Sequence, residues 1–230
     1  MKERLDQHPS LNCFKERWTG SLFVITAAAL ALFWAQIAQA QTHTVIKHFG
    51  ILSKVTGLNP RAPLVQGPDG TLYGTAAQGE GHGTVFKIQP DGTGFAVLKY
   101  FTDSAKWADP RAGLVLSGGT LYGTTFGTAQ AGNTSGYGTV FKVNTDGTGY
   151  TVLKSFTGSE GLQPSAGLVL SGGTLYGTTQ YGGSSGKGTV FKVNTNGTGY
   201  TVLKMFTGGD GKGPSAGLVP QEARFSRESG

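Results

Sequence analysis

The chain has 230 residues, one cysteine and a formal net charge of +6, and charged residues make up only 14% of it. This length allows one or two domains, and a lone cysteine excludes a framework of internal disulfides. The positive charge does not indicate nucleic-acid binding, because the lysines recur at even intervals instead of gathering into one basic patch.

Residues 1–40 have the features of a secretory signal peptide. A polar, basic stretch precedes an apolar run over residues 22–35, and Ala-Gln-Ala at 38–40 supplies the small-x-small pattern of a cleavage site. The run is shorter than the roughly 20 apolar residues of a membrane-spanning helix. We expect export by the general secretory route and removal of this segment together with Cys13. The alternative is an uncleaved anchor.

From residue 44 the chain is a tandem repeat with a step of about 50 residues. One unit contains four short apolar runs, at 166–170, 174–178, 189–194 and 200–206, which turn-forming residues separate. Runs of this length and setting indicate β-strands. The repeated blocks are Thr-Leu-Tyr-Gly-Thr from Thr71, Thr120 and Thr174, Gly-Thr-Val-Phe-Lys from Gly83, Gly138 and Gly188, Val-Leu-Lys-x-Phe from Val97, Val152 and Val202, and Pro-x-Ala-x-Leu-Val from Pro60, Pro110, Pro164 and Pro214.

The joints within each unit favour an antiparallel sheet. Asp-Gly at 91–92 and 146–147, and Asn-Gly at 196–197, stand between the third and fourth runs and favour tight hairpins. Apolar residues occupy both alternating faces of these runs, so each sheet is expected to be covered on both sides by its neighbours. We expect Phe141, Leu153 and Phe156 to form the core between sheets. The glycine after each repeat tyrosine is expected to permit a close approach.

The sequence therefore predicts an all-β fold, a β-propeller-like array of four-stranded antiparallel blades. The array covers residues 44–219 and holds three complete units with a partial unit at each end, which is an incomplete ring, because propellers usually close with four to eight blades. Residues 220–230 are a tail unlike the repeat, and we interpret them as the result of truncation or a frameshift. The alternative is that the open array closes by self-association with another chain.

The repeat blocks resemble the GloVer tandem repeat of exported bacterial proteins with varied C-terminal anchors. The resemblance covers residues 45–219 and rests on five blocks in fixed order. It implies a secreted or surface protein of propeller shape, and it implies no catalytic activity. The blocks that carry it are Gly-Thr-Leu-Tyr-Gly-Thr-Thr at 119–125, Gly-Thr-Val-Phe-Lys at 138–142, Asp-Gly-Thr-Gly-Tyr at 146–150, Val-Leu-Lys at 152–154 with Phe156, and Pro-Ser-Ala-Gly-Leu-Val at 164–169.

Four aromatic residues differ from copy to copy and fall in the connecting loops, as residues on a binding surface would. We expect them to contact a glycan or a cell-surface protein, since aromatic rings serve shallow binding surfaces well. The alternative is local packing beneath the long loops. These candidate ligand-binding residues are Trp107, Phe126, Tyr137 and Tyr181.

A second set of loop residues carries carboxylates, and paired acids can hydrolyse glycosides. Solvated or structural carboxylates are the simpler interpretation, so no catalytic residue is nominated. No histidine spacing indicates a metal site, and the sequence predicts no cofactor. The four acids are Asp103, Asp109, Glu160 and Asp210.

These patterns favour an exported, non-enzymatic repeat protein that acts as an extracellular or cell-surface binding or adhesion scaffold. The alternatives are a glycan-active hydrolase or lyase that uses the loop carboxylates, and a structural surface element without a discrete ligand. We expect no nucleic-acid partner. A membrane would be reached only through an uncleaved signal or a missing C-terminal anchor.

Overall fold

The computed structural model describes residues 44–47, 59–77, 83–101, 108–127 and 136–219. The predicted signal peptide and the 220–230 tail lie outside these residues, as do Asp103 and Trp107. All described strands belong to one compact unit, residues 45–230.

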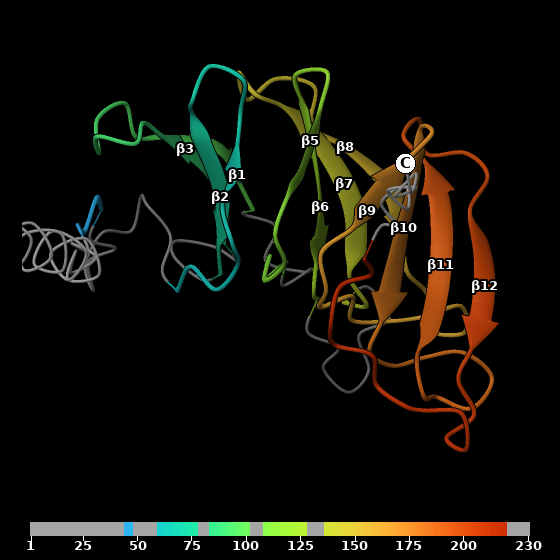
Figure 1. Cartoon of the computed structure of the whole chain (residues 1–230). Coiled ribbons are helices and arrows are strands. Elements are labelled where there is room, and N and C mark those ends of the chain that lie inside the picture. The colour runs from blue at the N-terminus through green and yellow to red at the C-terminus, as the bar shows by residue number, and fades with distance from the viewer. Residues whose placement is uncertain (1–43, 48–58, 78–82, 102–107, 128–135, 220–230) are drawn as a thin grey trace, which may run out of the picture. The chain divides into compact units, whose positions relative to one another are not determined.

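Three four-stranded antiparallel sheets follow one another along the chain, one for each complete repeat, which confirms the predicted all-β, propeller-like array (Figure 1). Within each sheet the strands pair in sequence order. The first sheet contains β1 (Val65–Gln66), β2 (Leu72–Ala76), β3 (Thr84–Ile88) and β4 (Ala96–Tyr100). The second contains β5 (Val115–Ser117), β6 (Thr120–Thr125), β7 (Thr139–Asn144) and β8 (Thr151–Ser155), and the third β9 (Val169–Ser171), β10 (Thr174–Thr179), β11 (Thr189–Asn194) and β12 (Thr201–Met205).

The first strand of a unit differs from its predicted bounds. The sequence places it at 166–170, whereas β9 covers Val169–Ser171. Ala166 and Leu168 are buried, at 5% and 6% exposure, although they lie before the strand. These two apolar side chains therefore pack between neighbouring sheets, and their backbone does not pair as part of β9. The fourth strand is also shorter than predicted, because Tyr200 and Phe206 flank β12.

The turns between third and fourth strands have the predicted hairpin chemistry. Asp146 accepts hydrogen bonds from the Thr148 amide at 2.8 Å and the Thr148 hydroxyl at 2.7 Å, and Gly147 takes a φ of 91°. Asn196 accepts the same pair of bonds from Thr198. The Thr148 hydroxyl, followed by its amide, holds the pKa of Asp146 below its ordinary value. Since an amide can replace the carboxylate, the turn needs an acceptor oxygen and no bound cation.

Neighbouring sheets pack face to face through apolar side chains. Between the second and third sheets, Phe156 and Phe191 meet edge to face with their ring centroids 5.2 Å apart, and the equivalent pair between the first and second sheets is Phe101 and Phe141 at 5.4 Å. Phe141, Leu153 and Phe156 are buried in these cores, as predicted. The core between the second and third sheets is formed by Tyr122, Val140, Leu153, Phe156, Leu168, Leu175, Phe191 and Val193.

Lysine side chains of the fourth strands contact aromatic rings of the next sheet. The Lys99 ammonium lies 4.2 Å from the ring centroid of Tyr150, and Lys154 lies 4.3 Å from that of Tyr200. The same contact joins Lys47 to Phe95 at 4.5 Å. Residues 45–47 thus sit on the first sheet as the end of a preceding fourth strand would.

Two repeat glycines are required by close approach. A Cβ on Gly123 would lie 2.7 Å from Cζ of Phe141 and 2.8 Å from Cδ2 of Leu114, so the glycine makes room for a core ring and a core leucine. A Cβ on Gly138 would lie 2.5 Å from the Thr125 carbonyl oxygen and 2.6 Å from Cδ of Pro164. The absence of a side chain at Gly138 therefore allows the backbone just before β7 to lie against Pro164, the first residue of the next repeat block.

Candidate functional site

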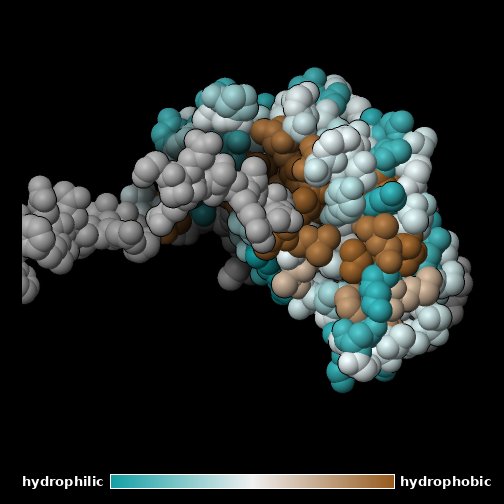
Figure 2. All heavy atoms as spheres, turned by 45° about the vertical axis from the view of Figure 1, so that its right-hand side comes forward, coloured by the Kyte–Doolittle hydropathy of each residue, from teal (hydrophilic) through white to brown (hydrophobic). Residues whose placement is uncertain are grey.

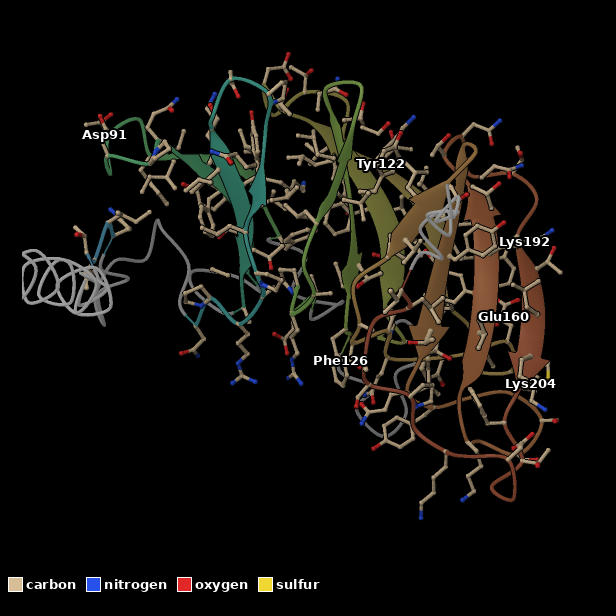
Figure 3. All side chains as sticks on the ribbon, viewed as in Figure 1. Asp91, Tyr122, Phe126, Glu160, Lys192 and Lys204 are labelled. Carbon is tan, nitrogen blue, oxygen red and sulfur yellow. The ribbon has the colours of Figure 1, made fainter. Side chains whose placement is uncertain are left out.

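Antiparallel pairing gathers the variable loops at one end of every sheet. The connections from second to third strand and from fourth strand to the next sheet lie at this end, whereas the repeated tight turns lie at the other. We call the first of these the loop edge; its described residues are 59–62, 77, 83, 108–112, 126–127, 136–138, 157–165, 180–188 and 207–214. Figure 3 shows Phe126 at this end of the second sheet.

Phe126 is part of a cluster with a buried acid. The Arg111 guanidinium lies 4.1 Å from the ring centroid of Phe126, and its Nε donates a 2.6 Å hydrogen bond to Asp109. A second guanidinium nitrogen also pairs with that carboxylate. The Phe126 amide donates to the Asp109 carbonyl at 3.1 Å. The ring is therefore held in place by a cation and remains half-buried.

Tyr137 packs inward. It is partly buried against the core between the second and third sheets, and its ring lies near Gly158, whose Cβ would come within 3.7 Å of it. Its carbonyl accepts a 2.8 Å hydrogen bond from the Gln163 amide. Of the two interpretations of this residue, its surroundings favour local packing.

Tyr181 is the most exposed of the aromatic candidates that the structure describes, with 45% of its surface accessible. Its backbone is fixed by a reciprocal pair of hydrogen bonds with Leu162, at 2.9 and 3.2 Å. The hydroxyl of Thr179 adds a bond to the Tyr181 carbonyl at 2.9 Å. An exposed ring on a fixed backbone loses little freedom when it binds, which suits a contact residue.

The loop carboxylates that the structure describes are each paired with a base. Lys154 pairs with Glu160, and Lys204 pairs with Asp210. Lys204, the largest contributor, holds the pKa of Asp210 well below its ordinary value with help from the Thr207 amide. Asp210 therefore stays ionised and would be a poor proton donor at neutral pH.

Glu160 also interacts with Tyr200, a partly buried tyrosine that packs against the core between the second and third sheets. Its carbonyl accepts hydrogen bonds from the Tyr200 hydroxyl at 3.1 Å and the Thr189 hydroxyl at 3.2 Å. Burial, followed by the nearby Glu160 charge, raises the pKa of Tyr200. This tyrosine is thereby kept neutral and structural.

Sequence reasoning missed one repeated backbone feature at the loop edge. The residue before each repeat proline takes a positive φ, 55° at Asn59, 45° at Asp109 and 58° at Gln163. The carbonyl of each of these residues accepts a hydrogen bond from the amide of a residue that follows a second strand. Ala77 donates to Asn59, Phe126 donates to Asp109, and Gln180 donates to Gln163. The recurring proline marks these positions in the sequence. It did not predict a positive φ, because a residue before proline ordinarily takes an extended backbone conformation.

The described loop edge thus brings an exposed Tyr181 and a half-buried Phe126 to one end of the sheets, and it turns Tyr137 inward. Within the described ranges, no group of three or more histidine, cysteine, aspartate or glutamate residues could hold a metal ion. No helix among those residues is long and apolar enough to cross a membrane.

Solved structures match this chain at TM-scores below 0.5 and at less than 20% identity. A chain of the crystal structure of the nidogen/laminin complex matches at a TM-score of 0.44 and 19% identity, over 63% of this chain and 48% of that one. The tricorn protease matches at 0.43 and 14% identity, over 66% and 14%, and TolB of Agrobacterium tumefaciens, itself described as putative, at 0.42 and 13%, over 66% and 51%. The match spans about half or less of each of those chains.

No curated protein matches this sequence. The sequence model of the Gloeobacter/Verrucomicrobia repeat matches residues 124–225, a region that begins within β6 and includes the whole third sheet. This match confirms the resemblance that the repeat blocks indicate. Residues 124–225 therefore carry the Gloeobacter/Verrucomicrobia repeat.

Proposed function

We propose that this protein is an exported, non-enzymatic scaffold that binds an extracellular or cell-surface partner, a glycan or a surface protein, through its loop edge. The observation that supports this most is the contrast between the two ends of each sheet. One end repeats the same tight turn, with Asp146 and Asn196 in equivalent roles. The other end varies and presents Tyr181 on a fixed backbone.

The ion pairs of the loop edge favour binding over hydrolysis. A glycosidase needs one carboxylic acid that can donate a proton, whereas Asp109, Glu160 and Asp210 each face a lysine or arginine. The role of these ion pairs in holding the loops accounts for the three carboxylates without a catalytic function. Assignment of the protein as a binding scaffold rests on this argument together with the exposed aromatic ring.

The test uses the exported chain and a panel of immobilised polysaccharides, namely cellulose, chitin, peptidoglycan and bacterial capsular glycans. Tyr181→Ala is expected to weaken the binding of the responding glycan by about two- to tenfold, since stacking on an aromatic ring contributes about 0.5 to 1.5 kcal/mol. Tyr181→Phe keeps the ring and is the matched control, and it is expected to bind as the unaltered chain does.

Equal binding by Tyr181→Ala and the unaltered chain would remove this surface from the proposal. Release of soluble sugar that is abolished by Asp109→Asn or Asp210→Asn would instead establish the hydrolase alternative. Circular dichroism of each variant separates loss of contact from loss of fold.

A further inference from the structure

Two lysines lie on neighbouring loops at the loop edge of the third sheet. The amide of Gly213, the residue after Lys212, donates a 2.8 Å hydrogen bond to the carbonyl of Lys187. Both lysines are exposed. Figure 2 shows hydrophilic residues at the lower end of the molecule, where Figure 1 places the loops that follow β10 and β12. The third sheet therefore presents two positive charges from two loops that are joined through their backbones.

The same two positions are uncharged in the second repeat. Tyr137 stands where the third repeat has Lys187, and it is followed by the same glycine. Leu162 stands where the third repeat has Lys212. A Cβ on Gly158 would lie 3.7 Å from Cζ of Tyr137 and 3.9 Å from Cδ2 of Leu162, so these two side chains pack around one glycine. The repeat can therefore build these loops without any charge, and its fold does not require the two lysines.

Among the described residues, no carboxylate pairs with Lys187 or Lys212. Asp210 lies two residues before Lys212, but its Oδ2 pairs with Lys204. Its Oδ1 accepts hydrogen bonds from the amide and the hydroxyl of Thr207, at 2.8 and 3.1 Å. Like charges held next to each other repel and lower stability. Two lysines in this arrangement suit an anion that comes from outside the chain.

The exposed ring of Tyr181 belongs to the same set of loops. The Gly188 amide donates a 3.0 Å hydrogen bond to the Gly182 carbonyl and closes the loop between them. Tyr181 directly precedes Gly182, and Lys187 directly precedes Gly188. The ring and the two lysines therefore project from backbones that hydrogen bonds already hold together. Binding has to order only the side chains, which lowers its entropic cost.

We propose that the loop edge of the third sheet binds an acidic polysaccharide. The Tyr181 ring lies against a sugar, and the ammonium groups of Lys187 and Lys212 pair with anionic groups of the same polymer. An ammonium group is a compact charge on a flexible stem, so two of them can reach anionic groups at different spacings. The aromatic ring adds an apolar contact that charge alone does not supply. This inference rests on the proposed function and names the class of glycan.

The test compares the binding of the exported chain to polygalacturonate and to its fully methyl-esterified form, which has the same backbone without the charges. The unaltered chain is expected to bind the acidic form about three- to tenfold more tightly, because exposed ion pairs each contribute modestly. This preference is expected to disappear at a salt concentration of about 1 M, where the screening length falls to about 3 Å.

A pair of double variants assigns the preference to these lysines. Lys187→Gln combined with Lys212→Gln is expected to lower the affinity for polygalacturonate to that for the ester, and to leave the affinity for the ester unchanged. Lys142→Gln combined with Lys192→Gln is the matched control, since it removes two charges from β7 and β11, outside the loop edge. The control is expected to keep the full preference. Circular dichroism confirms that both variants are folded.

The outcomes separate this inference from the proposed function. If the unaltered chain binds both polymers equally and Tyr181→Ala weakens both, the binding scaffold stands and the acidic class is wrong. A preference that survives the loss of Lys187 and Lys212 would place the anion elsewhere and overturn the inference. Equally tight binding to phosphatidylglycerol vesicles would also overturn it, because charge without sugar would then suffice. Failure to bind any glycan, neutral or acidic, would contradict both proposals.

Discussion

Replacing Gly138 by alanine is expected to lower the free energy of unfolding by about 3 to 5 kcal/mol, which is a large part of the stability of a domain of this size. The added Cβ would lie 2.5 Å from a backbone carbonyl oxygen and 2.6 Å from Pro164, and neither is a flexible group that can move aside. The φ of 93° adds backbone strain for any residue with a side chain. Urea denaturation followed by circular dichroism measures the change.

Gly209→Ala is the matched control for this experiment. No atom lies within 4 Å of a Cβ built on Gly209, and its φ is not positive. Alanine there is expected to leave stability unchanged or to raise it by up to about 1 kcal/mol, because it restricts the unfolded chain. If both variants unfold at the same urea concentration, the close contact between Gly138 and Pro164 does not exist in solution.

Phe191→Ala is expected to destabilise the protein by about 3 to 5 kcal/mol, the usual cost of removing a buried aromatic ring. Phe191 is completely buried, and its ring fills the space that Gly177 leaves on the neighbouring strand. It also contacts Phe156 of the preceding sheet. The midpoint of urea denaturation gives the change directly.

Tyr181→Ala provides the comparison for Phe191→Ala, since it removes an aromatic ring that is 45% exposed. Its effect on stability is expected to stay within about 0.5 kcal/mol, as for most surface positions. A cost for Phe191→Ala as small as that would show that the third sheet does not pack on the second through this ring.

The architecture was predictable because its signals repeat. Each block appears at least three times, so the hairpin at Asp146 is supported by those at Asp91 and Asn196. The four-strand unit, the apolar character of both faces and the buried positions of Phe141 and Phe156 all followed from this pattern. The first strand was misplaced because the pattern of Ala166 and Leu168 suits burial in a sheet interface as well as strand pairing.

The candidate site was less predictable because loop residues occur once each. Phe126, Tyr137 and Tyr181 were indistinguishable as loop aromatics in the sequence, and burial separates them in the structure: Tyr137 packs into a core, and Tyr181 faces solvent. The pairing of Asp109 with Arg111 could have been suspected from their spacing of two residues. The positive φ of Asp109 could not have been predicted from the sequence, because it depends on the hydrogen bond that the Asp109 carbonyl accepts from the Phe126 amide.

Consecutive repeats pack face to face through equivalent aromatic residues. A double-mutant cycle with Phe156→Leu and Phe191→Leu tests it most directly, because the two rings lie 5.2 Å apart across the interface between two sheets. We predict a coupling energy of about 0.5 to 1.5 kcal/mol for this pair. Phe101 and Phe191 belong to different cores and are expected to be additive. Additivity of Phe156 and Phe191 would contradict the packing described above.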